Sequence, residues 1–411
     1  MAAASRGKPR GRSTICLPIR KDLYDRIIDS PQQFRQWLDQ AFHDLPELFP
    51  KAFAQGYTLK DDRVSSKRGL RQRRICCKAT GAAFSIRPDF VLPYMVAWTD
   101  DASHPLFLRS FGVPFWALAR VFGRDSMFWY RLEVGLGRNS IVGTTVRQAS
   151  VPDHLLADEH HQRRDGMKNY IATTVGADCC LGAALSQAAD AEDLQAAYGV
   201  FKEEAQNVQA DYAPETVNTD GWAATQQAWR ALFPLVVILR CFLHGWLSIR
   251  ERAKHLGELF RMLGEKVWHA YHASQRRSFA QRLRRLGEWA SQHVKATWVL
   301  EQVRKLCGRA RVYGQAYAHP GGHRTSNMLD RVMRAMNRYY EDSQHLHGSE
   351  EACARHCRAW ALLHNFRPWH PAVARAHGGY ESPAVRLNQH RYHDDWLHNL
   401  LVSASMAGYR R

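Results

Sequence analysis

Residues 150–243 alternate between runs that suit β-strands and runs that suit helices, and this order limits the possible folds more than any other feature. Strand-like runs occur in "HLLADEHH", "KNYIATTVG" and "DCCLGAALS", and the polar "QRRDGM" after the first carries the glycine of a hairpin turn. An amphipathic helix follows in "DAEDLQAAYGVFKEEAQNV", then a strand ending in "NTDG", a helix, and the buried strand "LVVILRC". Three strands, helix, strand, helix, strand is the succession of an α/β domain with a mixed five-stranded sheet.

The rest of the chain divides around this segment. Residues 244–318 have no strand pattern and are rich in Arg, Lys, Leu, Trp and Ala at helical spacing, so an all-helical insertion is predicted. The predicted division is 1–20 basic flexible arm, 21–149 mainly helical DNA-binding region, 150–243 first part of the core, 244–318 insertion, 319–380 last part of the core, and 381–411 helical tail.

Residues 104–138 have the layout of a helix-turn-helix. Pro114 suits the first turn of one helix, Gly123 suits a tight turn, and a second helix is predicted from Ser126 to Leu136. In that motif the second helix enters the major groove of DNA. An ordinary helical hairpin explains the same pattern equally well.

The charge of the chain points to an anionic partner. Lys and Arg number 57 against 39 Asp and Glu, which gives a net charge of +18 and a pI of about 9.7. Nucleic acid is the favoured partner, and a membrane surface is second. No apolar run approaches the length of about 18 residues that a membrane span needs. The nine cysteines include no Cys-x-x-Cys, so a reducing cytoplasm, with association to the nucleoid, is the expected location.

Two aspartates end predicted strands. Asp158 closes an apolar run before a hairpin, and Asp220 closes another strand directly before Gly221. Strand ends are where ligands gather in an open α/β sheet, and a carboxylate beside a core is costly unless a metal or a donor compensates it. Carboxylates suit Mg²⁺, and two such ions about 3.5–4 Å apart can cleave a phosphodiester bond. For either residue alone, a turn or helix cap is the alternative.

The order of these motifs resembles the DD(E/D) insertion-sequence transposases with a ribonuclease-H-like catalytic core, of the Mutator and hAT-like group. The first acid lies in "LLADEHHQRRDGMKNYIATTVG", the second in "NTDGW", and the next strand leads to "LRCFLHGW" with the signature pair Cys241 and His244. The resemblance covers about residues 150–375. It favours a structural or DNA-contacting role for the pair over zinc binding, since no partner pair with suitable spacing follows.

The resemblance also implies a third acid on a helix after the insertion, usually a glutamate. The segment "TSNMLDRVMRAMNRYYED" offers Asp330 at the helix start, which we favour, with Glu341 as the alternative. An aspartate at this position departs from the family pattern. Four arginines of this segment could line a DNA channel: Arg324, Arg331, Arg334 and Arg338.

The function implied by the resemblance is metal-dependent cleavage and strand transfer at the ends of a mobile element. Asp158, Asp220 and Asp330 would hold two Mg²⁺ ions, or Mn²⁺ in their place. The expected partners are double-stranded DNA, as terminal inverted repeats and target, and further copies of the chain in a homo-oligomer, without a membrane. Two alternatives remain because one fold hosts many functions: a catalytically inactive or domesticated transposase-derived DNA-binding protein, and a ribonuclease-H-like nuclease that does not join DNA.

Overall fold

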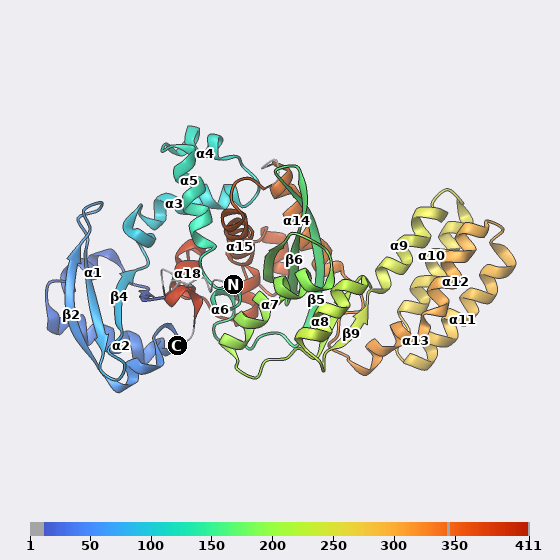
Figure 1. Cartoon of the computed structure of the whole chain (residues 1–411), viewed down its shortest axis with the longest axis horizontal. Helices are drawn as coiled ribbons and strands as arrows, with labels where there is room; N and C mark the ends of the chain where they lie inside the picture. Colours follow the sequence, from blue (N-terminus) through green and yellow to red (C-terminus); the bar gives the residue numbers. More distant parts are fainter. Residues whose placement is uncertain (1–11, 343–345, 410–411) are drawn as a thin grey trace, which may run out of the picture.

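The computed structural model describes residues 12–342 and 346–409. They form an elongated molecule with three parts in a row: an N-terminal sheet with its helices, a central α/β region, and a bundle of helices at the far end (Figure 1). The predicted mixed α/β class is confirmed, with one sheet of four strands and one of five. No helix in the described part of the chain is both long and apolar enough to cross a membrane.

The five-stranded sheet has the mixed arrangement that the sequence predicts. Its strands are β5 (His154–Arg164), β6 (Met167–Gly176), β7 (Cys179–Ser186), β8 (Thr216–Thr219) and β9 (Val237–Arg240). They lie in the order β7-β6-β5-β8-β9. The first three strands are antiparallel and joined by tight turns, whereas β8 and β9 run parallel to β5.

Helices cover both faces of this sheet. Side chains alternate along a strand, so Leu155 and Ala157 pack under α7 (Ala191–Val208) and α8 (Ala223–Leu232). Leu156 faces the other way, toward α14 (Asn327–Asp342) and α15 (Glu350–Phe366). The continuous apolar run that begins β5 is therefore buried on both sides.

The N-terminal part combines helices with the second sheet. Its strands are β1 (Thr14–Leu17), β2 (Tyr57–Val64), β3 (Arg71–Cys77) and β4 (Ala83–Pro88), in the order β1-β4-β3-β2. The two helices beside them are α1 (Lys21–Ile27) and α2 (Pro31–Asp44). The prediction of a flexible arm over 1–20 is wrong for β1, because its apolar Ile15 and Leu17 are fully buried and it pairs with β4. Residues 1–11 of that arm lie outside the described residues.

Four helices connect this sheet to the central region: α3 (Thr99–Arg109), α4 (Phe115–Phe122), α5 (Ser126–Leu136) and α6 (Ile141–Thr145). Gly123 has a φ of +72° between α4 and α5, and the Asp125 carboxylate caps α5 by accepting the Phe128 N–H at 2.8 Å. Helix α5 has the predicted bounds. One of its faces is buried, with Trp129 at 3% exposure, while Arg131 on the other side is exposed.

The segment after β9 folds as a helical unit with a core of its own. It consists of α9 (Phe242–Ala253), α10 (Glu258–Tyr271), α11 (Arg276–His293), α12 (Thr297–Gly308) and α13 (Ala310–Tyr313). A short 3-10 turn, Gly314–Ala318, ends the unit. It projects from the edge of the sheet formed by β9 (Figure 1).

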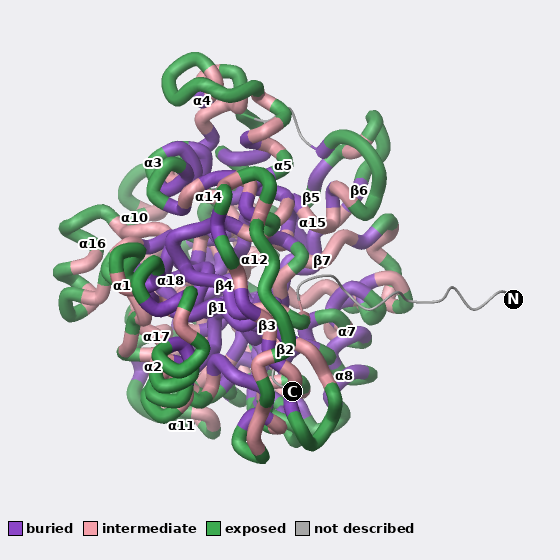
Figure 2. The backbone as a smooth tube through the Cα atoms, turned by 90° about the vertical axis from the view of Figure 1, so that its left-hand side faces the viewer, coloured by how far each residue is buried: buried purple, intermediate pink, exposed green. Residues whose placement is uncertain are grey.

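The C-terminal segment returns to the N-terminal sheet. It contains α16 (Pro371–Ala376), α17 (Pro383–Asn388) and α18 (Trp396–Ser403). Helix α18 is buried between β1 and α3, and Ser405 after it accepts the Cys16 N–H at 3.1 Å (Figure 2). Helices α17 and α18 thus form part of the N-terminal core.

A histidine on α18 joins two carboxylates of the N-terminal part. His398 is bonded through Nδ1 to Asp89 and through Nε2 to Asp100, both at 2.9 Å, and it stacks on His393 with ring centroids 4.3 Å apart. Burial opposes its charged form, but Asp89, then Asp100 and Asp395, raise the pKa of His398. These bonds join α18 to the residue after β4 and to α3, and the carboxylates favour the charged form of the imidazole.

We expect His398→Ala to destabilise the protein by about 2–3 kcal/mol at pH 6, because it removes the imidazole that is hydrogen-bonded to buried Asp89. A raised histidine pKa gives stability that is complete below about pH 6.5, the unfolded value, and is lost as the pH rises through the folded value. The difference from wild type should therefore shrink at pH 9. Urea unfolding at both pH values measures it, with exposed His104→Ala as the control. An equal difference at both pH values would contradict a charged His398.

Candidate active site

Two carboxylates lie level with each other on neighbouring parallel strands. β5 and β8 pair with Leu156 opposite Asn218. Asp158 lies two residues further along β5, and Asp220 lies two residues after Asn218, directly beyond the end of β8 at Thr219. The register therefore brings the two residues to a similar height at this end of the sheet. Asp158 Oδ1 accepts the N–H of the next residue at 2.8 Å, and Asp220 Oδ1 accepts the Trp222 N–H at 2.7 Å. The backbone thus orients each carboxylate through one oxygen.

The surroundings of Asp158 hold an excess of negative charge. Its pKa is raised to about 6, first by burial and then by Asp220, with a further contribution from Asp330. The N–H of Glu159 and the side chain of His244 act in the opposite direction. The structure therefore brings the three predicted acids into one electrostatic neighbourhood. Hard carboxylate oxygens with uncompensated charge fit the needs of Mg²⁺ or Mn²⁺.

Cys241 is hydrogen-bonded to Ser326, which in turn is hydrogen-bonded to Asp330. Asp330 lies in the first turn of α14, and its Oδ2 accepts the Ser326 hydroxyl at 3.0 Å. The Cys241 thiol donates to the same hydroxyl at 3.4 Å. Cys241 follows β9 directly and is 1% exposed. The chain Cys241–Ser326–Asp330 thus fixes the third acid relative to the sheet edge.

His244 lies between the cysteine and the acids. The neighbouring Cys241 is the largest cause of its raised pKa of about 9, with Asp220 and Asp158 adding to it against burial. Burial favours the neutral Cys241 thiol, but His244 and Ser326 outweigh this and lower its pKa. Cys241 and the acids therefore favour the charged form of His244, which would compensate part of the charge of the acids.

Glu341 does not share this position. It lies eleven residues after Asp330 on the same helix, which is about 16 Å along the axis, and it is exposed. Arg334 and Arg338 are exposed and follow the partly buried Asp330 at intervals of four residues, so the three side chains lie in one row along α14. Arg331 is also exposed and forms an ion pair with Asp178 at 2.9 Å.

Arg324 has an internal role in this structure. Its guanidinium lies 4.4 Å from the ring centroid of Tyr317 and 4.5 Å from that of Tyr271, and it donates to the Tyr317 hydroxyl at 2.8 Å. Its backbone carbonyl accepts the Phe242 N–H at 3.0 Å. Arg324 thus fastens the helical unit to the core, a contact that the linear sequence could not reveal.

Sequence reasoning missed a buried acid behind the site. Glu159 follows Asp158, so it points to the opposite face of β5, where the Tyr198 and Thr225 hydroxyls donate to it at 2.7 and 2.9 Å. Burial is the main cause of its pKa of about 7. The alternation of the strand was the available signal, because Leu155, Ala157 and Glu159 share the face that α7 and α8 cover.

Another group has closer metal-type ligands than the three acids. Asp89, His393 and His398 offer ligand atoms within 4.8 Å of one another. However, the Asp395 N–H donates to His393 Nδ1 at 2.9 Å, so a neutral His393 carries its proton on Nε2, the nitrogen that faces Asp89. That arrangement suits an ion-pair cluster. Two ions about 4 Å apart do not require three carboxylates to be so close together, because each ion contacts only its nearest oxygens.

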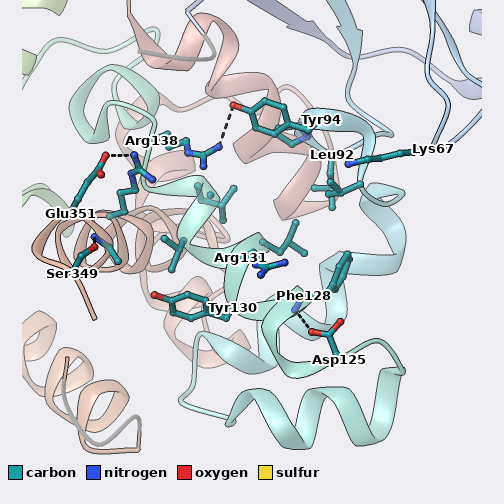
Figure 3. Close-up of a pocket in the computed structure, with 18 residues that line it drawn as sticks. Lys67, Leu92, Tyr94, Asp125, Phe128, Tyr130, Arg131, Arg138, Ser349 and Glu351 are labelled. Atoms are coloured by element: carbon teal, nitrogen blue, oxygen red, sulfur yellow. Dashed lines mark hydrogen bonds and ion pairs between the residues drawn. The ribbon is translucent and has the colours of Figure 1, made fainter. Parts of the chain in front are cut away.

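A cavity of about 640 Å³ lies along α5, and Asp158, Asp220 and Asp330 are not among its lining residues (Figure 3). Its cationic lining residues are Lys67, Arg131, Arg138 and Arg355. Arg138 donates to the hydroxyl of Tyr94 at 3.2 Å, and Tyr94 has a φ of +60° and is 55% exposed. This basic surface includes the exposed side of the helix that the helix-turn-helix hypothesis assigns to DNA.

Comparison with known proteins gives no family for the chain: no protein-family model matches the sequence, and no curated protein matches it.

Proposed function

We propose that this protein is a DNA transposase with a ribonuclease-H-like core, which cleaves and joins strands at the ends of a mobile element. The convergence of Asp158, Asp220 and Asp330 at one edge of the mixed sheet carries the proposal. The strand order β7-β6-β5-β8-β9 and the helical unit inserted after β9 support it. The net charge of +18 suits a substrate of double-stranded DNA.

The proposed chemistry assigns a task to each residue. Two bound Mg²⁺ or Mn²⁺ ions would supply an activated nucleophile and stabilise the leaving oxygen. Asp158 and Asp220 would hold the ions from the sheet, and Asp330 would complete the site from α14. Cys241 and Ser326 keep Asp330 in place, and His244 limits the repulsion among the acids.

Asp330→Asn is expected to abolish metal-dependent nicking of DNA from the ends of the element, whereas Glu341→Gln should keep it. Of these two acids, it is Asp330 that contributes to the raised pKa of Asp158. The loss should reach at least about a hundredfold, since a metal ion contributes several kcal/mol to the transition state. Gel analysis of labelled duplexes with Mg²⁺ or Mn²⁺ measures it. The reverse pattern would move the third acid to Glu341.

The same assay separates the proposal from its alternatives. Cleavage followed by joining of the 3′-OH end to target DNA supports a transposase. Cleavage without joining would favour a nuclease, and specific DNA binding without cleavage would favour a DNA-binding protein derived from a transposase. Two ends must be held together for joining, so we expect a homo-oligomer on DNA.

A further inference from the structure

We infer that a small cationic cavity beside Asp220 binds a backbone phosphate of a nucleic-acid strand. The cavity has a volume of about 150 Å³ and lies between the end of β9, the start of α9, and α12 with α13. Its cationic residues are Arg240, His244, Lys305 and Arg309, and Asp220 is its one carboxylate. The inference rests on the proposed function for the identity of the strand, but the binding of phosphate does not depend on cleavage.

Arg240 is held directly beside the candidate active site. It pairs with Thr219 in the β8–β9 ladder, next to Asp220. Gly221 has a φ of +101°, and a Cβ at this glycine would lie 2.5 Å from Arg240 Cζ. A side chain at residue 221 would therefore displace the guanidinium from this position. Among the described residues, no carboxylate oxygen lies within ion-pair distance of Arg240, so its charge is available to a ligand.

The helical unit supplies the opposite wall. Lys305 and Arg309 are four residues apart and therefore share one side of the chain at the end of α12. Lys305 also forms a 2.7 Å ion pair with Glu301, but both partners are more than half exposed. Such a surface pair contributes at most about 1 kcal/mol, so a phosphate can compete for Lys305.

The shape and charge together select the ligand class. A volume of about 150 Å³ is below the roughly 300–1,000 Å³ of pockets for drug-sized ligands. Guanidinium groups make charge-assisted, bidentate hydrogen bonds to phosphate oxygens. A phosphate in the cavity would contact the sheet on one side and α12 on the other. The helical unit would thereby hold the strand against the edge where Asp220 lies.

The test uses the full-length protein without metal, with a fluorescein-labelled oligothymidine strand as the probe and inorganic phosphate as the competitor. We expect Arg240→Gln/Arg309→Gln to weaken binding of the probe about tenfold, because the variant loses charge-assisted hydrogen bonds to phosphate. The slope of log affinity against log salt should fall by about 1. Arg304→Gln/Arg311→Gln is the control with the same change of charge, because both arginines are exposed on α12 and α13, which wall the cavity, and neither lines it.

The inference is overturned if the cavity variant and the control variant bind the probe alike, or if inorganic phosphate competes equally for both. Thermal unfolding must show that both variants are folded. If the cavity variant melts early, Lys305→Gln/Arg309→Gln replaces it, because both side chains are exposed. Cleavage is measured separately on wild type, with Asp158→Asn as the inactive control. If wild type binds the probe through Arg240 and Arg309 but does not cleave DNA, the proposed function is refuted and the phosphate site stands.

Discussion

Asp158→Asn should abolish metal-dependent cleavage, by at least about a thousandfold, and yet raise the thermal stability of the metal-free protein. The loss follows from removing a ligand whose ions contribute several kcal/mol to the transition state. The gain follows from the raised pKa of Asp158, about 6, which shows that the folded protein disfavours the charged carboxylate. A neutral amide of the same size relieves burial in a low-dielectric site and repulsion by Asp220 and Asp330.

The pH dependence of this gain has a definite sign. Below about pH 4 the carboxyl is protonated in both folded and unfolded chains, and the variant should have no advantage. Between about pH 4, where the carboxyl ionises in the unfolded chain, and about pH 6, where it ionises in the folded chain, the wild type alone loses stability. The variant should therefore lead by about 1–2 kcal/mol at pH 7.5 after allowance for solvent screening. Differential scanning calorimetry in EDTA measures it.

Adding Mg²⁺ or Mn²⁺ should reverse the order. The ions should raise the melting temperature of wild type more than that of Asp158→Asn, because binding to the folded state stabilises it. Asp153→Asn is the control, as Asp153 is exposed on the loop before β5. A variant that is inactive but gains no stability in EDTA would show that Asp158 is not under electrostatic strain.

Glu133→Gln is expected to destabilise the protein by about 3–5 kcal/mol, the usual result of removing one partner from a buried ion pair. Glu133 is fully buried on α5, and its Oε2 accepts the Arg109 Nε–H at 2.9 Å. Arg109 on α3 is 1% exposed and lies between the rings of Phe115 and Tyr339, 4.2 and 4.3 Å from their centroids. The variant would remove the carboxylate that is hydrogen-bonded to the buried Arg109 guanidinium.

The same cluster joins helices α3 and α5 to the central region. Tyr339 on α14 donates its hydroxyl to Glu133, and His356 on α15 lies 2.6 Å from that hydroxyl through Nε2. Burial opposes the charge of Glu133, but Arg109, then His356 and Tyr339, lower its pKa to about 2. Its contribution is therefore complete above about pH 4.5, the unfolded value, and is lost as the pH falls toward 2.

Urea denaturation of Glu133→Gln and Glu265→Gln gives the comparison. Glu265 pairs with Arg261 at the surface, with both side chains more than 60% exposed, so its loss should cost less than about 1 kcal/mol. If the two variants lose similar free energies of unfolding, the buried cluster does not bind α3, α5 and α14 together. We also expect Glu133→Gln to weaken DNA binding in proportion to the loss of structure around α5.

The sequence was sufficient where a local period carried the information. The alternation and turn residues of 150–243 predicted the five-stranded sheet, and Gly123 predicted the turn before α5. The prediction of a flexible arm over 1–20 was wrong for β1, because this strand is buried by pairing with β4, some seventy residues later in the chain. A four-residue apolar run has no local signal that separates a strand from a loose arm.

For the candidate site, the sequence identified the residues and the tertiary structure determined their relations. Strand context singled out Asp158 and Asp220, but only the β5–β8 register places them level. The choice of Asp330 over Glu341 depends on the bond from Ser326, itself bonded to Cys241 across a gap of 85 positions. Contacts between distant segments also turn Arg324 inward and place Arg240 at the wall of a cavity. A side chain's charge is written in the sequence, whereas its solvent exposure and its partners depend on contacts between distant segments.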